Sequence, residues 1–307
     1  MTENEINLLD INQAYHDFFA FKCENLMEAY NTTIMAGMTA ILLHVFMAIL
    51  FKVFGGKIIG KDVNMAANII VFGYTVFLCV FVGAIGWIQV DEPRSAEDRL
   101  LSINSQSLWL TSTIFGILVI YDIPCRVRFI PALRNDTEML LHHCIWAFTA
   151  FIGSFGLLSG AYYYLFFFGF CEISSIPLVI VDFFHPRKFG ELIDDDKINF
   201  SIIGKINDIA RFLYPITYLL LRGLYFPFVY AACLIPDLMY MILDEKSPMS
   251  EDQKGYLWLT VLAATCLLAL QLYWAEVVFY QFKKWVGNDD GKPKPNTGKR
   301  NRNYKDD

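Results

Sequence analysis

The sequence predicts an all-α fold, a polytopic transmembrane helix bundle of about seven spans. Of its 307 residues, 55% are hydrophobic and only 18% are charged, whereas a soluble domain carries about 25% charged residues. The apolar residues also gather in runs of about 20 or more, the length of helix that crosses a bilayer. No basic stripe interleaves with aromatic residues outside the carboxyl-terminal tail, so nucleic acid is not an expected partner.

Residues 1–33 are expected to form an amphipathic amino-terminal segment. Leu8, Ile11 and Tyr15 recur at about helical spacing, and acidic residues such as Asp10 lie between them. An acidic polar face disfavours docking on anionic lipid headgroups. The segment is therefore expected to pack on the bundle or on a protein partner.

The expected spans form one bundle over residues 34–285. They cover residues 34–54, 66–90, 107–123, 139–158, 161–184, 209–240 and 255–282. The polar stretch at residues 91–106, DEPRSAEDRLLSINSQ, is expected to be an aqueous loop.

The sixth expected span is too long for a simple crossing. Residues 209–240 would make a helix of about 48 Å at 1.5 Å per residue, against a bilayer core of about 30 Å. The span also contains Pro215, Pro227 and Pro236, and proline kinks helices. We interpret it as one kinked span, with two short half-helices as the alternative.

The placement of Lys and Arg predicts the orientation in the membrane. Five of them fall on the amino-terminal side and eighteen on the carboxyl-terminal side, leaving aside two in the sixth span. The carboxyl terminus is therefore expected to face the cytosol from the endoplasmic reticulum or another endomembrane. The alternative is the matrix side of the mitochondrial inner membrane. Residues 286–307 form a basic polar tail that, like residues 1–33, is a candidate contact for protein partners.

Glu172 is the strongest single indication of a site. It lies near the middle of the fifth span, with no charged residue within nine positions on either side. An ionised side chain at the bilayer centre costs about 2.5–3.5 kcal/mol on insertion scales, so Glu172 needs a partner, a proton or a polar cavity. Arg222 is the expected partner because it lies at a similar depth, whereas Asp122 lies nearer a membrane face and has Arg126 available. The pair would either line a functional site or only fix the bundle, and both interpretations stay open.

Ser174, Ser175 and Pro177 follow Glu172 within two turns of helix. Proline has no N–H, so Pro177 leaves the carbonyl of Ile173 available to water or to a neighbouring side chain. A carboxylate, two hydroxyls and a broken backbone hydrogen bond together predict a polar notch at membrane depth.

His142 and His143 are adjacent, so on a helix they point about 100° apart. That spacing disfavours joint binding of one metal ion, unlike the i, i+4 pairs of helical zinc sites. His143 shares a helix face with small residues, Ala147 and Ala150, and this face is expected to line a cavity. The alternative is two histidines at a helix entrance, hydrogen-bonded to carbonyls and headgroups. His44, in the first span, is expected to be a packing histidine.

Three stretches resemble one known family, the TLC-domain membrane proteins. They are Tyr121-Asp122, then Glu138 with Leu141-His142-His143-Cys144, then Glu172-Ile173-Ser174-Ser175-Ile176-Pro177. The resemblance covers roughly residues 60–285. It implies a bundle of about six to eight helices around a central cavity that admits lipid chains.

The resemblance also argues against the best-known reaction of the family. In the ceramide synthase branch, the His-His pair is joined by a His-Asp-x-x-Asp motif that completes an acyl-transfer site. This chain has Cys171-Glu172-Ile173-Ser174-Ser175 at that place. It is more similar to the branch with Glu-x-Ser-x-Pro, whose members are linked to membrane lipid composition and are mostly not established enzymes.

The expected function is therefore a non-catalytic membrane protein that binds lipid in an intramembrane polar cavity and takes part in membrane lipid homeostasis. No cofactor other than bound lipid and no metal is expected. One alternative is an accessory subunit of a larger membrane complex, and another is a lipid acyltransferase with His142 or His143 as general base. The residues expected to line the cavity are His142, His143, Glu172, Ser174, Ser175 and Arg222.

Overall fold

The computed structural model describes residues 3–54, 63–89, 95–101, 104–130, 133, 137–156, 162–183, 202–244 and 251–286. Of residues 3–22 only the backbone is described. Every element in these ranges is a helix, so the described chain contains no strand. The predicted all-α class is confirmed.

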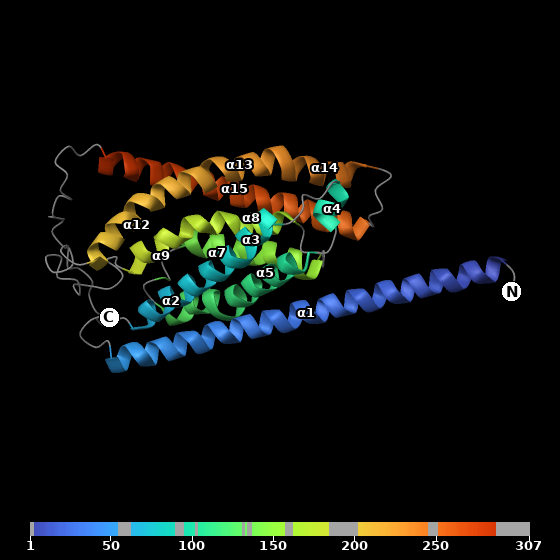
Figure 1. Cartoon of the computed structure of the whole chain (residues 1–307), viewed down its shortest axis with the longest axis horizontal. Coiled ribbons are helices and arrows are strands. Elements are labelled where there is room, and N and C mark those ends of the chain that lie inside the picture. Colours follow the sequence, from blue (N-terminus) through green and yellow to red (C-terminus); the bar gives the residue numbers. More distant parts are fainter. Residues whose placement is uncertain are drawn as a thin grey trace.

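Seven runs within the described ranges are long and apolar enough to cross a membrane, the number predicted. They lie side by side (Figure 1). The first run is α1 (Glu3–Phe54), the second α2 (Val63–Leu78), η1 (Cys79–Ala84) and α3 (Ile85–Gln89), and the third α5 (Ser105–Gly116), η2 (Ile117–Asp122) and η3 (Cys125–Phe129). The fourth is α7 (Thr137–Phe151) and η4 (Ile152–Gly156), and the fifth α8 (Tyr163–Phe168), η5 (Phe170–Ser174) and α9 (Ser175–Phe183). The sixth is α12 (Ile202–Tyr218), η6 (Leu219–Tyr225), α13 (Phe226–Val229), η7 (Tyr230–Leu234) and α14 (Ile235–Leu243), and the seventh α15 (Glu251–Val286).

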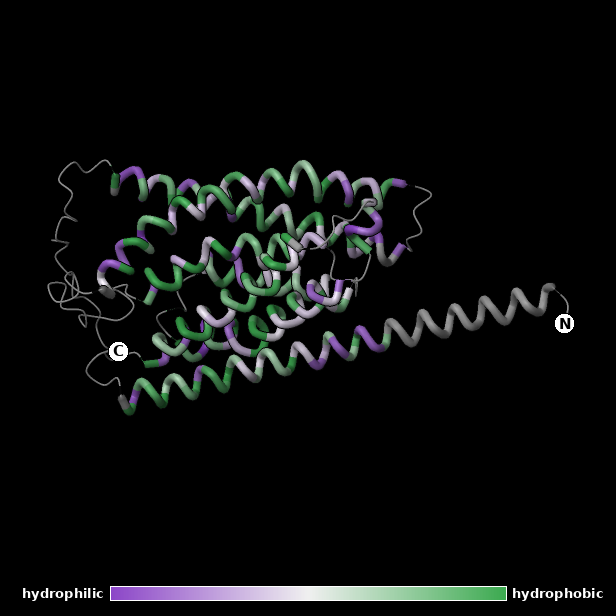
Figure 2. Tube along the Cα trace, in the orientation of Figure 1, coloured by the Kyte–Doolittle hydropathy of each residue, from purple (hydrophilic) through white to green (hydrophobic). Residues whose placement is uncertain are grey.

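Large apolar side chains cover the outside of the bundle as well as its core. Met35 and Ile88 are each 70% exposed, and Tyr280 is 69% exposed. Hydrophobic residues run along every span (Figure 2). Because a soluble protein leaves few such contiguous apolar surfaces, these outer faces are built to contact lipid chains.

The first span and the amino-terminal segment form one uninterrupted helix, α1, with no break near residue 33. Asn25 is the first residue of α1 that is described as buried, followed by Ala29 and Thr33. Thr33 donates a hydrogen bond to the carbonyl of Ser112 on α5. The amino-terminal part of α1 extends well beyond the rest of the bundle (Figure 1).

The sixth span is a single helical run of 40 residues, Gly204–Leu243, so the half-helix alternative is wrong. At 1.5 Å per residue it is about 60 Å long. The run stays helical through Pro215, Pro227 and Pro236. The π-helical turns η6 and η7 precede Pro227 and Pro236, and they contain the backbone carbonyls one turn before these two prolines. Such local changes of helix type satisfy backbone groups that a proline leaves unpaired.

The stretch at residues 91–106 was expected to be an aqueous loop, and for its central part this is wrong. Residues Ala96–Leu101 form a short helix, α4, and Leu100 on it is only 1% exposed. Arg99 donates from Nε to Asp237 Oδ2 at 2.5 Å and from Nη2 to Oδ1 at 2.6 Å. Burial of one leucine and a two-point ion pair to α14 therefore hold α4 against the bundle.

The second and fifth spans cross at two glycines. A β-carbon at either Gly83 or Gly169 would overlap the backbone of the other. Small residues permit this close approach between membrane helices. The crossing places η5, which carries Glu172, directly against η1.

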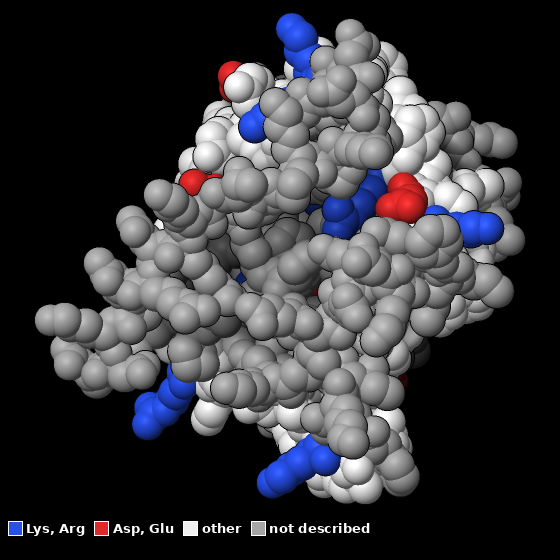
Figure 3. Space-filling view, turned by 90° about the vertical axis from the view of Figure 1, so that its left-hand side faces the viewer, with Lys and Arg blue, Asp and Glu red and all other residues white. Residues whose placement is uncertain are grey.

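The described charged residues at one end of the bundle are mainly basic. Figure 3 views this end, where α1 and α15 finish and α12 begins. The exposed basic residues near it are Lys52, Arg128, Lys205, Lys283 and Lys284. We call it the basic end below. Of the predicted tail at residues 286–307, all but Val286 lies outside the described residues.

Candidate functional site

A cavity of about 300 Å³ lies inside the bundle and extends from the middle of the membrane to the basic end. Its wall takes side chains from α2, η2, α7, η5, α9, α12, η6 and α15. Of the six residues predicted for the site, those that line it are His142, His143, Glu172, Ser175 and Arg222. The sixth, Ser174, lies behind the wall, where it binds Arg222.

Glu172 is held in the cavity wall by a local change of helix type. It is 3% exposed and lies on η5, a 3-10 turn between α8 and α9. Its N–H donates to the carbonyl of Gly169 at 3.0 Å. Pro177 has no N–H to offer to the carbonyl of Ile173, and Ile173 lies in this 3-10 turn.

Arg222 binds Glu172 directly, so the predicted ion pair is confirmed. The guanidinium Nη2 donates to Glu172 Oε1, and the two residues are 5% and 3% exposed. Ser175 Oγ donates to the other carboxylate oxygen, Oε2, at 2.6 Å. Both oxygens of the carboxylate therefore have a partner, which a buried charge requires.

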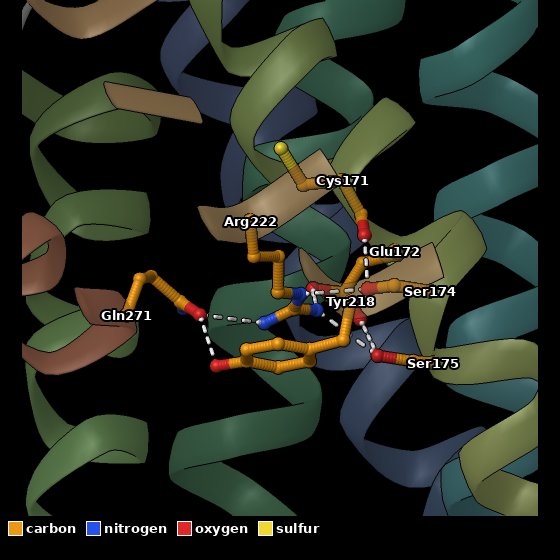
Figure 4. A network of polar contacts seen from close by, with 7 residues as sticks. All are labelled: Cys171, Glu172, Ser174, Ser175, Tyr218, Arg222 and Gln271. Carbon is orange, nitrogen blue, oxygen red and sulfur yellow. Dashed lines mark hydrogen bonds and ion pairs between the residues drawn. The ribbon is translucent and has the colours of Figure 1, made fainter. Parts of the chain in front are cut away.

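The rest of the guanidinium is also satisfied (Figure 4). Arg222 Nε donates to Ser174 Oγ at 2.8 Å, and Nη1 lies 3.5 Å from Gln271 Oε1. The Tyr218 hydroxyl donates to the same Gln271 oxygen at 2.8 Å, and the Tyr218 ring centroid lies 5.6 Å from the guanidinium carbon. This network joins the fifth, sixth and seventh spans through Arg222.

Tyr218 and Gln271 were missed by the sequence-based prediction. Gln271 is 2% exposed and lies within the seventh span. The sequence does indicate Gln271, because an uncharged amide is unusual in an apolar run, but a search for charged residues does not find it. Tyr218 carried no signal, since tyrosine is common in membrane helices.

A second ion-paired cluster lies on η2 and α7. Asp122 is 7% exposed, accepts from Arg126 Nε at 2.8 Å and binds His143 Nδ1 through the same oxygen, Oδ2. The Asp122–Arg126 contact is as expected, but Asp122 also reaches the histidine and lines the cavity. It therefore belongs to the site, from which the prediction had omitted it.

His142 lies beside His143 in the cavity wall, with their ring centroids 5.6 Å apart. It is 5% exposed and packs against two tryptophans, with ring centroids 5.3 Å from Trp146 and 4.9 Å from Trp274. Its Nδ1 has no hydrogen-bond partner within the described part of the chain. His142 is therefore a buried polar side chain in the cavity wall whose Nδ1 lacks a hydrogen bond to the described residues.

The helix face that His143 shares with Ala147, Ala150 and Ser154 was expected to line a cavity, and beyond His143 this is wrong. The three small residues are at most 5% exposed and are not among the residues that line the cavity. His44 forms a hydrogen bond through Nδ1 with the Tyr121 hydroxyl at 2.8 Å, as a packing histidine would. No group of three or more His, Cys, Asp or Glu side chains able to hold a metal occurs in the ranges that the structure describes.

These features define a class, the polytopic helical membrane proteins with an ion-paired polar cavity inside the bundle. The chain belongs to the TLC-domain family, because the family model of the TLC domain (TRAM_LAG1_CLN8) matches residues 68–279. That range contains all six predicted site residues and also Asp122, Tyr218 and Gln271. No curated protein and no solved structure gives a significant match.

Proposed function

We propose that this TLC-domain protein is a non-catalytic lipid-binding protein whose cavity holds a lipid with an uncharged headgroup. The cavity's size supports the proposal, since ligand pockets span about 300–1,000 Å³. Its apolar wall suits an acyl chain and includes Val71, Ile117, Leu178 and Val277. Binding of such lipids is the basis on which we propose a role in membrane lipid homeostasis.

The two arginines of the site already have carboxylate partners, and this observation is the reason for proposing an uncharged headgroup. Arg222 is bound to Glu172, and Arg126 is bound to Asp122. A phosphate group would have to compete with these carboxylates for its arginine, whereas a hydroxyl or an amide would not. His142, a polar side chain of the cavity wall, is the hydrogen-bond partner that we propose for such a group. The lipid's headgroup is therefore a neutral hydrogen-bonding one.

The stretch from Glu172 to Pro177 supports a place in the Glu-x-Ser-x-Pro branch of the family. Glu172 and Ser174 match the pattern, and Pro177 lies one position later than the pattern has it. This branch assignment is part of the proposal.

Native mass spectrometry of gently extracted protein tests lipid binding. Leu178→Trp fills the cavity from its wall, whereas Leu220→Trp places the same side chain at a position that is 55% exposed on the lipid-facing surface. We expect co-purified neutral lipid on the wild type and on Leu220→Trp, and its loss from Leu178→Trp. Equal occupancy in all three proteins would reject the cavity as the binding site.

A lipid acyltransferase is the second candidate function, and the His143–Asp122 contact favours it. A carboxylate on Nδ1 holds a histidine in the tautomer whose Nε2 can accept a proton. In acyl transfer from an acyl-CoA, the acceptor amine or alcohol attacks the thioester carbonyl and the coenzyme A thiolate leaves. His143 would take the acceptor proton and return it to the thiolate.

Incubation of the purified protein with an acyl-CoA and a sphingoid base tests this candidate. Product that His143→Gln and Asp122→Asn both abolish would support acyl transfer. Absence of product from a wild-type protein that retains bound lipid would reject it. We rank it second because the His-Asp-x-x-Asp motif of the ceramide synthase branch is replaced in this chain by Cys171-Glu172-Ile173-Ser174-Ser175.

A role as accessory subunit is the third candidate, supported by the length of α1 that extends beyond the bundle (Figure 1). The proposed partner contacts are residues 1–33 and the tail at residues 286–307. Native electrophoresis after mild extraction separates the cases. A larger assembly that is lost on truncation of residues 1–20 would support a partner, and migration as a monomer would count against one.

The basic end supports the proposed orientation, with the carboxyl terminus in the cytosol and the protein in the endoplasmic reticulum or another endomembrane. The alternative remains the mitochondrial inner membrane, with this end in the matrix. Protease treatment of sealed microsomes tests the orientation. We expect the protease to remove an epitope tag placed at the carboxyl terminus. A protected tag would reverse the orientation.

A further inference from the structure

A second opening, of about 380 Å³, lies on the lipid-facing side of the bundle between α1 and the η2–η3 turns. Exposed apolar residues form its rim, with Val45 49% exposed and Phe129 62% exposed. Both lie within segments that are long and apolar enough to span the membrane. Its lining also contains polar groups, His44 and Asn64. We call it the lateral crevice.

Tyr121 separates the lateral crevice from the intramembrane cavity. Among the described residues it alone lines both spaces. It is 3% exposed and packs with Ala40, Val71 and Ile117, so α1, α2 and η2 meet around it. Displacement of this one side chain would bring the two spaces into contact.

The tyrosine is held in place by hydrogen bonds to two different helices. Asn68 on α2 donates from Nδ2 to the Tyr121 oxygen at 3.1 Å. The hydroxyl proton is then available to His44 Nδ1 on α1, 2.8 Å away. The rings of His44 and Tyr121 also lie against each other, with centroids 5.6 Å apart.

The backbone around Tyr121 is not a regular α-helix. It belongs to η2, a π-helical turn that ends at Asp122. π-helical turns inside membrane helices are frequent at functional sites. Because the next residue is the Asp122 that binds His143, a shift of η2 would move the partition and the cavity wall together.

We propose that the lateral crevice is the portal through which a neutral lipid passes between the bilayer and the cavity, and that Tyr121 is its gate. The occupant is a lipid of the leaflet on the basic side. Its chain contacts the apolar rim, and its hydroxyl or amide head exchanges hydrogen bonds with His44 and Asn64 before it reaches His142. This inference rests on the proposed lipid binding and names the path by which that site fills.

Photo-crosslinking in proteoliposomes measures the filling of the cavity. The probe is a diacylglycerol with a diazirine and an alkyne, supplied from donor vesicles of phosphatidylcholine to the full-length protein. Samples are irradiated at intervals, and labelled peptides that contain Trp146 or Trp274 report on cavity occupancy. The variants are Val45→Trp, which narrows the crevice at its rim, and Tyr121→Phe, which keeps the ring and removes both hydrogen bonds.

Val119→Trp is the matched control. Val119 is 43% exposed, a fraction similar to the 49% of Val45, and it lines neither of the two spaces. Gln281→Trp narrows the cavity where it approaches the basic end. We expect the probe to label the cavity of Val45→Trp more slowly than the cavity of Val119→Trp. It should label the cavity of Tyr121→Phe faster by about fivefold to thirtyfold, the factor that one to two net hydrogen bonds contribute.

The outcomes separate the portal from the binding site. Absence of cavity labelling in the wild type at equilibrium would overturn both proposals. Cavity labelling at rates that Val45→Trp and Tyr121→Phe leave unchanged would overturn the portal and leave lipid binding intact. A slower rate in Gln281→Trp alone would assign the path to the basic end instead.

Discussion

The guanidinium of Arg222 binds the carboxylate of Glu172 across fifty positions of sequence, at the centre of the bundle. The two residues are only 5% and 3% exposed, and a buried charge depends on a partner of opposite sign. The contact explains how an acidic and a basic residue are both tolerated in apolar spans.

Removal of one member of this pair should destabilise the protein more than removal of both. Glu172→Ala leaves Arg222 buried without its carboxylate, and breaking a buried pair costs about 3–5 kcal/mol. The double variant Glu172→Ala/Arg222→Met should recover part of that loss. Unfolding in mixed micelles gives the free energies for the double-mutant cycle, and additive effects would show that the two residues do not interact.

Gln271→Leu should destabilise the bundle by about 1–3 kcal/mol, because it leaves the Tyr218 hydroxyl without its acceptor. Tyr218→Phe should cost less, about 1 kcal/mol, since it removes a donor and leaves Gln271 near Arg222. Leu272→Ala, one position along and 46% exposed, is the control. The same unfolding measurement ranks the three variants, and a Gln271→Leu protein as stable as the control would contradict the network.

Asp237→Ala should release α4 from the bundle. The carboxylate accepts two bonds from Arg99 and one from the Tyr163 hydroxyl at 2.5 Å. Limited proteolysis between residues 91 and 106 should become faster in Asp237→Ala, and less so in Tyr163→Phe, which loses one hydrogen bond. Glu97→Ala changes an exposed carboxylate on α4 and should leave the rate as in the wild type. Equal rates in all variants would show that the ion pair does not hold α4.

Gly169→Ala should destabilise the protein by about 1–3 kcal/mol, the usual cost of overpacking. The new methyl group would overlap the backbone of Gly83, which cannot move aside as a side chain could. Gly255→Ala is the matched control, because nothing lies within 4 Å of its added β-carbon. Thermal unfolding by intrinsic fluorescence compares the two, and equal midpoints would contradict the tight crossing.

The number and order of the spans could be predicted from the sequence, because apolar length alone decides which helices cross a bilayer. The Glu172–Arg222 pair could be predicted for a related reason. A lone charge at membrane depth demands a partner, and Arg222 lay at the matching depth. Neither inference depends on how the helices turn about their axes.

Contacts that depend on helix rotation could not be predicted. Arg126, four positions along the chain, was the expected partner of Asp122. The second contact of Asp122, with His143, depends on how η2 and α7 face each other. α4 was missed for a different reason. A short polar stretch predicts a loop. Only the fold shows that Leu100 is buried in the core and that Arg99 binds Asp237.

The π-helical turn η6 determines the side of the sixth span on which Arg222 lies. Arg222 lies within this seven-residue turn, where the backbone holds more residues per turn than an α-helix does. If the same seven residues of η6 formed an ordinary α-helix, one flank of the span would be rotated by about one residue, about 100°, relative to the other. The alignment of this side chain with Glu172 thus depends on the helix type of η6 as well as on the composition of the span, and a change of this turn to α-helix would rearrange the cavity with every side chain of the site still present.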